Sequence, residues 1–218
     1  MFPFSRDFIA FAVACGAIQF GEFRTKAGRL SPYFFNSGIF DNGERLHKLG
    51  QFYAKAIVAS GIRFDMLFGA AYKGIPLVAG TAIALAEAGC NVPFCFNRKE
   101  AKDHGEGGKT VGAPLRHRVL IVDDVISAGT SVRESVALIR GAAAEPCGVI
   151  VSIDRMERGT GLLSATQEVT KRFGIPVTSI ATLDDLIAFL QTQEDLEQYL
   201  HSIARYREQH GVTGNEGS

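Results

Sequence analysis

The sequence has no excess of charge of either sign. Lys and Arg together number 23, and Asp and Glu together also number 23, so the formal net charge is zero. A nucleic acid is drawn to a positive surface field, and a chain with this charge balance does not produce one as a whole. Nucleic acid is therefore not expected as a main partner, although a local basic cluster can still bind a smaller anion.

Long apolar runs are also missing. No uninterrupted apolar stretch approaches the roughly 18 residues that a membrane-spanning helix needs. The N-terminal segment 1–20 is apolar, but Arg6 and Asp7 interrupt it early and no basic region precedes it, unlike a secretory signal. The apolar positions instead suit one face of a helix; they are Phe8, Ile9, Phe11, Ala12 and Ala14. We expect no membrane partner and a cytoplasmic location.

Cysteines are few, and their spacing excludes the common metal and redox motifs. The four are Cys15, Cys90, Cys95 and Cys147, with no C-x-x-C pair and no zinc-finger grouping with His. We expect them to be small buried apolar residues of a protein in a reducing compartment.

Short apolar runs alternate with helix-like stretches through most of the chain. Strands are predicted at 64–70, 93–98, 118–125 and 148–155, and 176–190 has the pattern of a strand followed by a helix. Further helices are predicted at 75–89 and 131–144. This alternation implies parallel strands with right-handed crossovers, so the predicted fold class is α/β, with a doubly wound, mainly parallel sheet.

The first sixty residues do not follow this format. They indicate a helix, a strand-like segment at 21–36 and a second helix from 41 to 61, with Asp41 as its N-cap. We predict that residues 1–60 form a small hood subdomain within one structural unit and that 61–209 form the core. The polar, Gly-rich end at 210–218 is predicted to be a disordered tail.

The strongest chemical signal lies at 119–131, VLIVDDVISAGTS. An apolar strand ends in Asp123 and Asp124, and a turn of small residues then opens a helix. Backbone N–H groups of such a turn can surround a phosphate, while two acids suit sugar hydroxyls better than a triphosphate. The P-loop lysine pattern is absent. A ribose 5-phosphate fits this arrangement; the alternative is a capped helix with two solvated acids.

Two other segments carry charge beside glycines. Residues 69–77, GAAYKGIPL, place Lys73 in a Gly-flanked turn at a strand end, which suits the binding of a pyrophosphate. The alternative for this segment is an ordinary loop with an exposed Lys. Residues 97–115 form a long polar loop that is rich in basic residues and glycine, and such loops are usually functional or disordered. A solvated surface hairpin is the alternative for this second segment.

At 119–131 the chain resembles the type I phosphoribosyltransferases. The resemblance implies that Asp123 and Asp124 hold the ribose hydroxyls of phosphoribosyl pyrophosphate (PRPP). It also implies Mg²⁺, held mainly by PRPP, with the same two acids reaching the ion through water. The remaining residues implied in phosphate binding are Val125, Ile126, Ser127, Ala128, Gly129, Thr130 and Ser131.

The same resemblance gives roles to the two charged segments. Tyr72 and Lys73 would contact the pyrophosphate, and 98–109 would be a mobile catalytic loop that reaches the neighbouring subunit's site in a homodimer. The residues implied both to bind PRPP and to stabilise the leaving group are Lys73, Arg98, Lys99, Lys102 and His104. Whether Lys102 or His104 protonates the leaving oxygen stays open.

The segment 23–36, FRTKAGRLSPYFFN, is similar to the N-terminal signature of the orotate phosphoribosyltransferases. By this resemblance Lys26 would contact PRPP and orotate, and Phe34 and Phe35 would enclose the flat base; core packing is the alternative for the two rings. Ser127 would reach the base, and Arg155 would pair with the orotate carboxylate. Arg24 and Ala27 depart from the usual Thr and Ser.

The function implied is the conversion of orotate and PRPP to orotidine 5′-phosphate and diphosphate, in de novo pyrimidine biosynthesis. A purine phosphoribosyltransferase would share 119–131 but lack the hood signature and Arg155. A PRPP-sensing regulator would need no basic loop, and often carries a nucleic-acid-binding appendage.

Overall fold

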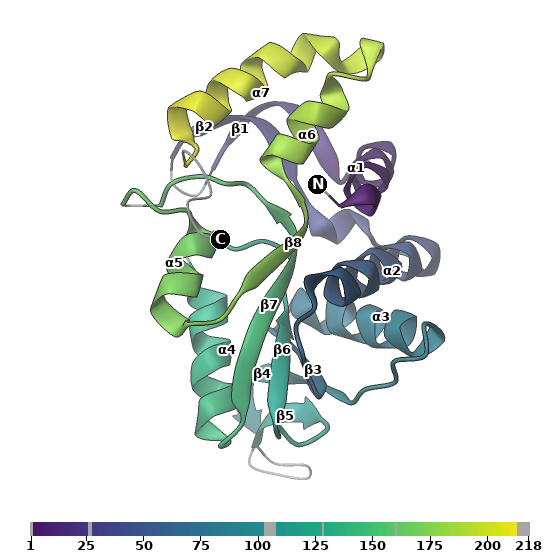
Figure 1. The fold of residues 1–218 in the computed structure, drawn as a ribbon, viewed down its shortest axis with the longest axis vertical. Coiled ribbons are helices and arrows are strands. Elements are labelled where there is room, and N and C mark those ends of the chain that lie inside the picture. The colour runs from purple at the N-terminus through teal and green to yellow at the C-terminus, as the bar shows by residue number, and fades with distance from the viewer. Residues whose placement is uncertain (1, 26–27, 103–107, 128, 160, 213–218) are drawn as a thin grey trace.

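The computed structural model describes residues 2–25, 28–102, 108–127, 129–159 and 161–212, without the side chains of 101, 102 and 108. Its centre is a six-stranded sheet in the described part of the chain, with strand order β5-β4-β3-β6-β7-β8 (Figure 1). All neighbouring pairs are parallel except β4 and β5. The strands are β3 (Met66–Gly69), β4 (Phe94–Lys102), β5 (Gly108–Gly112), β6 (Arg118–Val122), β7 (Glu145–Asp154) and β8 (Val177–Thr182). The predicted α/β fold class is confirmed.

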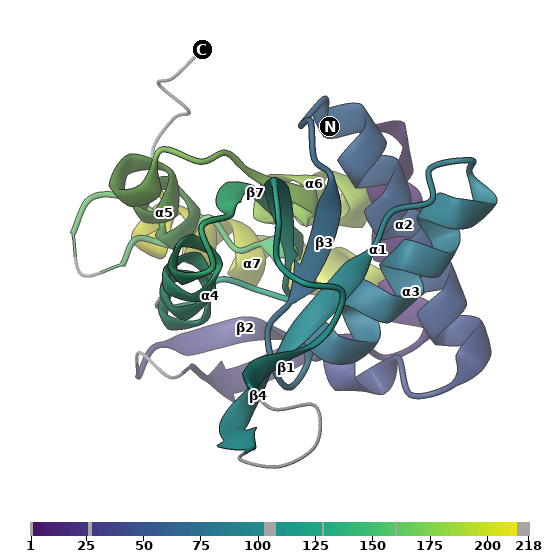
Figure 2. The same cartoon turned by 90° about the horizontal axis from the view of Figure 1, so that it is seen from below.

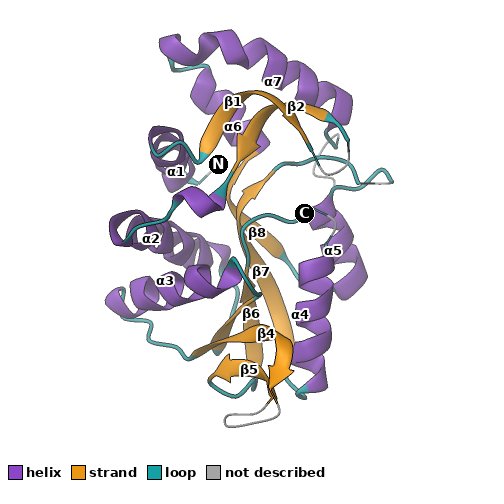
Figure 3. Ribbon diagram, turned by 180° about the vertical axis from the view of Figure 1, so that it is seen from behind, coloured by secondary structure: helices purple, strands orange, loops and turns teal. Residues whose placement is uncertain are grey.

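Helices cover both faces of this sheet (Figure 3). On one face lie α1 (Pro3–Ala14), α2 (Gly43–Ser60) and α3 (Gly74–Glu87), and on the other lie α4 (Thr130–Gly141) and α5 (Ala165–Phe173). Alternate residues of β6 point to opposite faces of the sheet. Leu120 and Val122 pack in one apolar cluster, and Val119 and Ile121 pack in the other. Burial on both faces is why this strand is apolar at every one of those positions.

The hood is a separate two-stranded antiparallel sheet of β1 (Ile18–Arg24) and β2 (Leu30–Phe35). The chain reaches α2 through the short helix η1 (Ser37–Ile39). At its other end the chain runs through α6 (Leu183–Leu190), η2 (Glu194–Leu196) and α7 (Glu197–His210), and α7 packs on β2 (Figure 2). The C-terminal helix thus contacts the predicted hood, and the boundary at residue 60 stays a prediction.

Several local predictions need correction. The N-cap of α2 is Asn42, whose side chain accepts a hydrogen bond from the Arg45 N–H at 3.0 Å, whereas Asp41 forms an ion pair with the Arg45 side chain. The end of the chain is held through residue 212, because Gly211 pairs with Glu157 and Val212 is buried. The predicted disordered tail therefore does not begin at 210; residues 213–218 lie outside the described residues.

The apolar residues of α1 and the cysteines only partly follow prediction. Phe8, Ile9 and Ala12 are buried, Phe11 is half-buried and Ala14 is exposed. All four cysteines are free; Cys95 is buried, and the other three are half-buried. No helix in the described ranges is both long enough and apolar enough to cross a membrane.

Candidate active site

Three loops meet at one edge of the sheet, beyond the carboxyl ends of β3, β6 and β7. These strands are neighbours, so the loops 70–73, 123–129 and 155–158 follow them side by side. Ligands of doubly wound sheets bind at this edge. The sequence predicted roles in the site for Lys73, the acidic turn and Arg155, and each of these lies in one of the three loops.

Asp124 joins three segments that are distant in sequence. Its Oδ2 accepts a hydrogen bond from Lys73 Nζ at 2.8 Å and another from Ser37 Oγ at 2.8 Å. Its Oδ1 accepts from the backbone N–H of Val125 at 2.8 Å. Asp124 therefore links the hood, the loop after β3 and the loop after β6. Sequence reasoning identified Asp124 and Lys73 but not Ser37, whose approach depends on the placement of η1.

Asp123 has a different environment from its neighbour. It is 6% exposed, and its carboxylate accepts from Ser131 Oγ at 2.7 Å and from the Asp124 N–H at 2.9 Å. Burial raises the pKa of Asp123 to about 6, the nearby charge of Asp124 acts in the same direction, and the Ser131 hydrogen bond opposes both. This carboxylate is already satisfied within the fold, whereas Asp124 faces a cation.

Two buried residues that the sequence did not indicate hold the acidic turn. The Tyr53 hydroxyl, on α2, donates to the Asp123 carbonyl at 2.7 Å and lies 2.6 Å from Ser152 Oγ. The Ser152 N–H donates to the Asp124 carbonyl at 2.9 Å. Burial raises the pKa of Tyr53 well above its ordinary value, so it stays a neutral donor. These contacts fix the backbone of both acids from β7 and α2.

The turn after the acids opens directly into α4. Gly129 has φ 65°, a left-handed conformation that favours glycine, and is the N-cap of α4. Ser127 and Thr130 are exposed, so their hydroxyls and the N-terminus of α4 are accessible to an anion. Ile126 is buried in the core, so it offers a ligand its backbone only; Val125 is half-buried, and Ala128 lies outside the described residues.

Two glycines allow the loop after β3 to close tightly. A Cβ on Gly69 would lie 2.2 Å from the Gly74 carbonyl oxygen, and a Cβ on Gly74 would lie 2.9 Å from the Gly69 carbonyl carbon. The Ala71 N–H donates to Asn97 Oδ1 at 2.6 Å, which ties this loop to β4. Tyr72 is 68% exposed, and Lys99 Nζ lies 5.3 Å from its ring centroid.

The predicted loop 97–115 is shorter than expected. β4 extends to Lys102, and β5 begins at Gly108 and pairs antiparallel with it, so both flanks of the segment are strand. Arg98 and Lys99 lie on β4, next to the loop after β3. The side chain of Lys102 and all of His104 lie outside the described residues, so their predicted roles stay predictions.

The two hood phenylalanines face opposite sides of β2. Phe35 is 7% exposed and packs in the core near Phe8 and Phe40, whereas Phe34 is 42% exposed and stacks on Phe23 at 5.5 Å. Because neighbouring strand residues alternate between faces, the two rings do not enclose one flat ligand between them. Lys26 lies outside the described residues.

Arg155 follows β7 and contacts β2 of the hood. Its Nε donates to Glu157 Oε1 at 2.7 Å, and its Nη2 donates to Ser31 Oγ at 3.0 Å. Its guanidinium carbon lies 4.4 Å from the centroid of the buried Tyr33 ring. The predicted base-binding arginine is thus held by a carboxylate, a hydroxyl and an aromatic face, none of which the sequence indicated.

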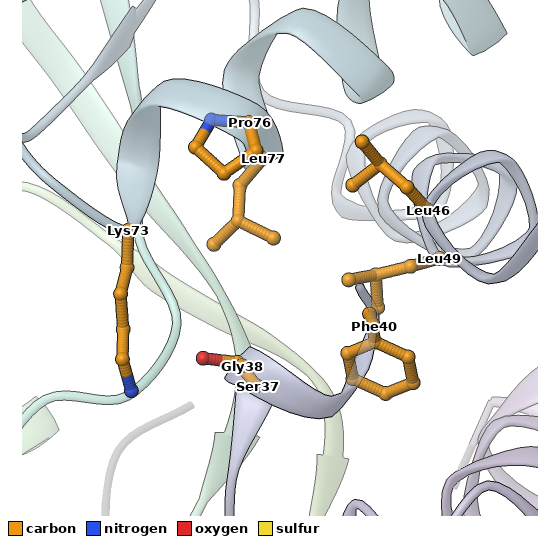
Figure 4. A pocket seen from close by; sticks show the side chains of 8 residues that line it. All are labelled: Ser37, Gly38, Phe40, Leu46, Leu49, Lys73, Pro76 and Leu77. Carbon is orange, nitrogen blue, oxygen red and sulfur yellow. The ribbon is translucent and has the colours of Figure 1, made fainter. Parts of the chain in front are cut away.

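A small cavity of about 140 Å³ lies next to the Lys73 loop (Figure 4). Ser37 and Lys73 lie at one side of it, and the rest of its lining is Gly38, Phe40, Leu46, Leu49, Pro76 and Leu77. Since both polar residues bind Asp124, this cavity adjoins the acidic turn.

Comparisons with known proteins agree with this geometry. A family model described as the phosphoribosyl transferase domain matches residues 37–171, which include both acids and Arg155. The orotate phosphoribosyltransferase of Thiobacillus denitrificans is 62% identical over 212 residues, which cover 97% of this chain and 100% of the relative. That of Neisseria meningitidis serogroup C is 60% identical over 212 residues, with the same shares.

A solved structure has the same architecture. The crystal structure of orotate phosphoribosyltransferase from Francisella tularensis superposes with a TM-score of 0.86 at 38% identity, and the match covers 94% of this chain and 100% of that one. The similarity therefore extends over nearly the whole chain.

Proposed function

Because the chain belongs to the orotate phosphoribosyltransferase family, we propose that it transfers the phosphoribosyl group of PRPP to orotate. The products are orotidine 5′-phosphate and diphosphate, and the reaction belongs to de novo pyrimidine biosynthesis. The observation that carries the proposal is the pairing of two sites at one sheet edge: the acidic turn after β6 and the half-buried arginine after β7.

The acidic turn supplies what a sugar phosphate needs. Asp124 presents a carboxylate to the ribose hydroxyls once Lys73 turns from it to the pyrophosphate. Asp123 holds the backbone of Asp124 by accepting a hydrogen bond from its N–H. The exposed Ser127 and Thr130 and the start of α4 accept the 5-phosphate. Phe34 offers one apolar face to the base, and Arg155 pairs with the orotate carboxylate.

Magnesium fits this donor set without a protein cage. The described residues contain no group of three or more His, Cys, Asp or Glu side chains that could hold a metal ion. Two adjacent carboxylates are hard oxygen donors, and Mg²⁺ is usually held by one or two such groups together with substrate phosphates. Asp124 would hold it through water, whereas the Asp123 carboxylate, to which the resemblance gave the same role, is buried and accepts from Ser131. The ion would supply positive charge beside the diphosphate.

Catalysis of this reaction depends on stabilising the charge of the leaving group more than on a protein nucleophile. As the bond between ribose C1 and diphosphate breaks, positive charge develops on the sugar and negative charge on the leaving group. We propose that Lys73, Arg98 and Lys99 stabilise the diphosphate, and that Lys102 and His104 complete the set when the 98–109 segment closes and excludes water. Orotate N1 bonds to C1 and releases its proton to solvent as the bond between C1 and diphosphate breaks. Either Lys102 or His104 protonates the leaving oxygen.

We also propose a homodimer in which this segment reaches the neighbouring active site, and a cytoplasmic location. The first rests on the family resemblance. The second rests on the cysteine usage, since all four cysteines are free.

The test is a panel of bases. Orotate, uracil and adenine are each supplied with PRPP and Mg²⁺, to the wild type and to Arg155→Ala. We expect rapid turnover of orotate alone, with loss of roughly 100-fold or more in kcat/KM for orotate in Arg155→Ala, since a buried charge pair with the substrate disappears. Turnover of adenine instead would move the chain to the purine enzymes, and tight PRPP binding with no turnover would indicate a sensor.

A further inference from the structure

Glu157 places a second carboxylate at the predicted base site. Its Oε1 accepts from Arg155 Nε at 2.7 Å, and its Oε2 lies 3.6 Å from Arg29 Nη1. The three side chains are 17%, 16% and 24% exposed for Arg155, Glu157 and Arg29, so water screens them only in part. A carboxylate held this closely fixes the plane of the Arg155 guanidinium.

The backbone around Glu157 is held from both ends of the chain. The Arg158 N–H donates to the His210 carbonyl at 2.8 Å, and the Val212 N–H donates to the Met156 carbonyl at 2.9 Å. From the hood, Arg29 Nη2 donates to the Arg158 carbonyl at 2.8 Å. Met156 itself has φ 53°, which is unfavourable for a residue with a side chain, so these contacts hold a strained turn in place.

The charges of the cluster do not cancel. Two guanidinium groups and one carboxylate leave one net positive charge. Within the cluster, Nε of Arg155 donates to Glu157 and Nη2 donates to Ser31 of the hood. One uncompensated positive charge matches a ligand with a single carboxylate.

We propose that Glu157 is the positioning residue of Arg155 and that Arg29 offsets its charge, so that the three side chains form a receptor for the carboxylate of the base. The inference rests on the proposed function. A base without a carboxylate leaves the net positive charge of this half-buried cluster uncompensated, which disfavours its binding. Selection of the base thus depends on a residue of the hood and on the C-terminal contacts, as well as on Arg155.

The test compares Glu157→Ala, Glu157→Gln and Arg29→Ala with the wild type in steady-state kinetics. We expect Glu157→Ala to raise KM for orotate by about tenfold or more, the effect of losing a hydrogen bond to a charged group. KM for PRPP and kcat should stay within about twofold of wild type, because Arg155 does not touch the leaving group. Glu157→Gln should rescue part of the effect, since its amide oxygen can still accept from Nε.

Asp65→Asn is the matched control. It breaks the ion pair between Asp65 and Arg118, at the start of β6, without touching Arg155 or the C-terminal contacts, and should leave all constants unchanged. Thermal unfolding of each variant identifies any that fails to fold, in which case Glu157→Gln and Arg29→Ala carry the test. An unchanged KM for orotate in the folded variants, or equal rises in KM for both substrates, would overturn the role of Glu157. Absence of orotate turnover in the wild type would instead overturn the proposed function.

Discussion

Two adjacent aspartates have different surroundings, and burial raises the pKa of Asp123. Asp124 pairs with Lys73 and Ser37, whereas Asp123 is buried and meets Ser131. Sequence identified both acids, because two carboxylates after an apolar strand form a local pattern. It could not separate them, because burial depends on Tyr53 and Ser152, which come from other parts of the chain.

The raised pKa of Asp123 predicts a pH dependence of stability. Its folded value of about 6 exceeds the ordinary value near 4, so between these pH values the folded state binds more protons than the unfolded state. The stabilisation is fully present below about pH 4 and is lost as pH rises through about 6, a change of up to about 3 kcal/mol in the free energy of unfolding. Urea unfolding of the ligand-free protein at pH 4–7 measures it.

Asp123→Asn should lack this contribution to stability. The difference in the free energy of unfolding between the wild type and this variant should therefore change with pH. Asp41→Asn, at an exposed carboxylate, serves as the control and should follow the wild type. Parallel pH profiles for the wild type and Asp123→Asn would contradict the assignment.

Lys102 is predicted to act on the leaving diphosphate. Lys102→Ala should lose turnover by roughly two or more orders of magnitude, as when a charge partner of a transition state is removed. Steady-state kinetics with Lys171→Ala, an exposed lysine on α5, as the control measures this. Turnover equal to wild type would exclude the role.

At the level of elements, periodicity predicted the strands and helices that carry strong apolar patterns. It missed α5 and α7, which are polar overall, although Ser164 and Gln167 form a capping box that marks the start of α5. It also missed β5, because the β4–β5 pair consists mostly of polar and glycine residues that periodicity does not distinguish from a loop.

Close packing of α2 against α3 depends on a glycine. A Cβ on Gly50 would lie 2.5 Å from the Gly80 carbonyl oxygen, so Gly50→Ala forces the helices apart. We expect a loss of about 1–3 kcal/mol, seen as a drop in Tm of roughly 2–4 °C per kcal/mol. Gly141→Ala, with no atom within 4 Å of its Cβ, gains similar helix propensity without a clash and is the control. Equal melting temperatures for the wild type and Gly50→Ala would show that α2 and α3 move apart without a loss of stability.

The whole molecule brings distant parts of one chain to a single edge of the sheet. Lys73, Asp124 and Arg155 could be predicted to share this edge, because the carboxyl ends of neighbouring parallel strands meet there. Ser37, Arg29 and Glu157 could not, because their contacts depend on how the hood and the C-terminus dock. The opposite orientations of Phe34 and Phe35 follow from strand alternation once β2 is known.

The proposed dimer makes a prediction at this scale. Light scattering should give a mass twice the 23.5 kDa of one chain. Lys102→Ala and Asp124→Ala should each be inactive, and their mixture should regain activity, because a mixed dimer has one site with both residues intact. A mixture as inactive as its parents would show that the segment serves its own subunit.

The measurement to make first is the loss of orotate absorbance by the wild type, with diphosphate release followed in the same sample. With PRPP and Mg²⁺ present, we expect orotate to disappear and diphosphate to form in equal amounts, and neither change when PRPP is left out. Diphosphate release without loss of orotate, or no reaction at all in folded protein, would contradict the assignment of this chain as an orotate phosphoribosyltransferase.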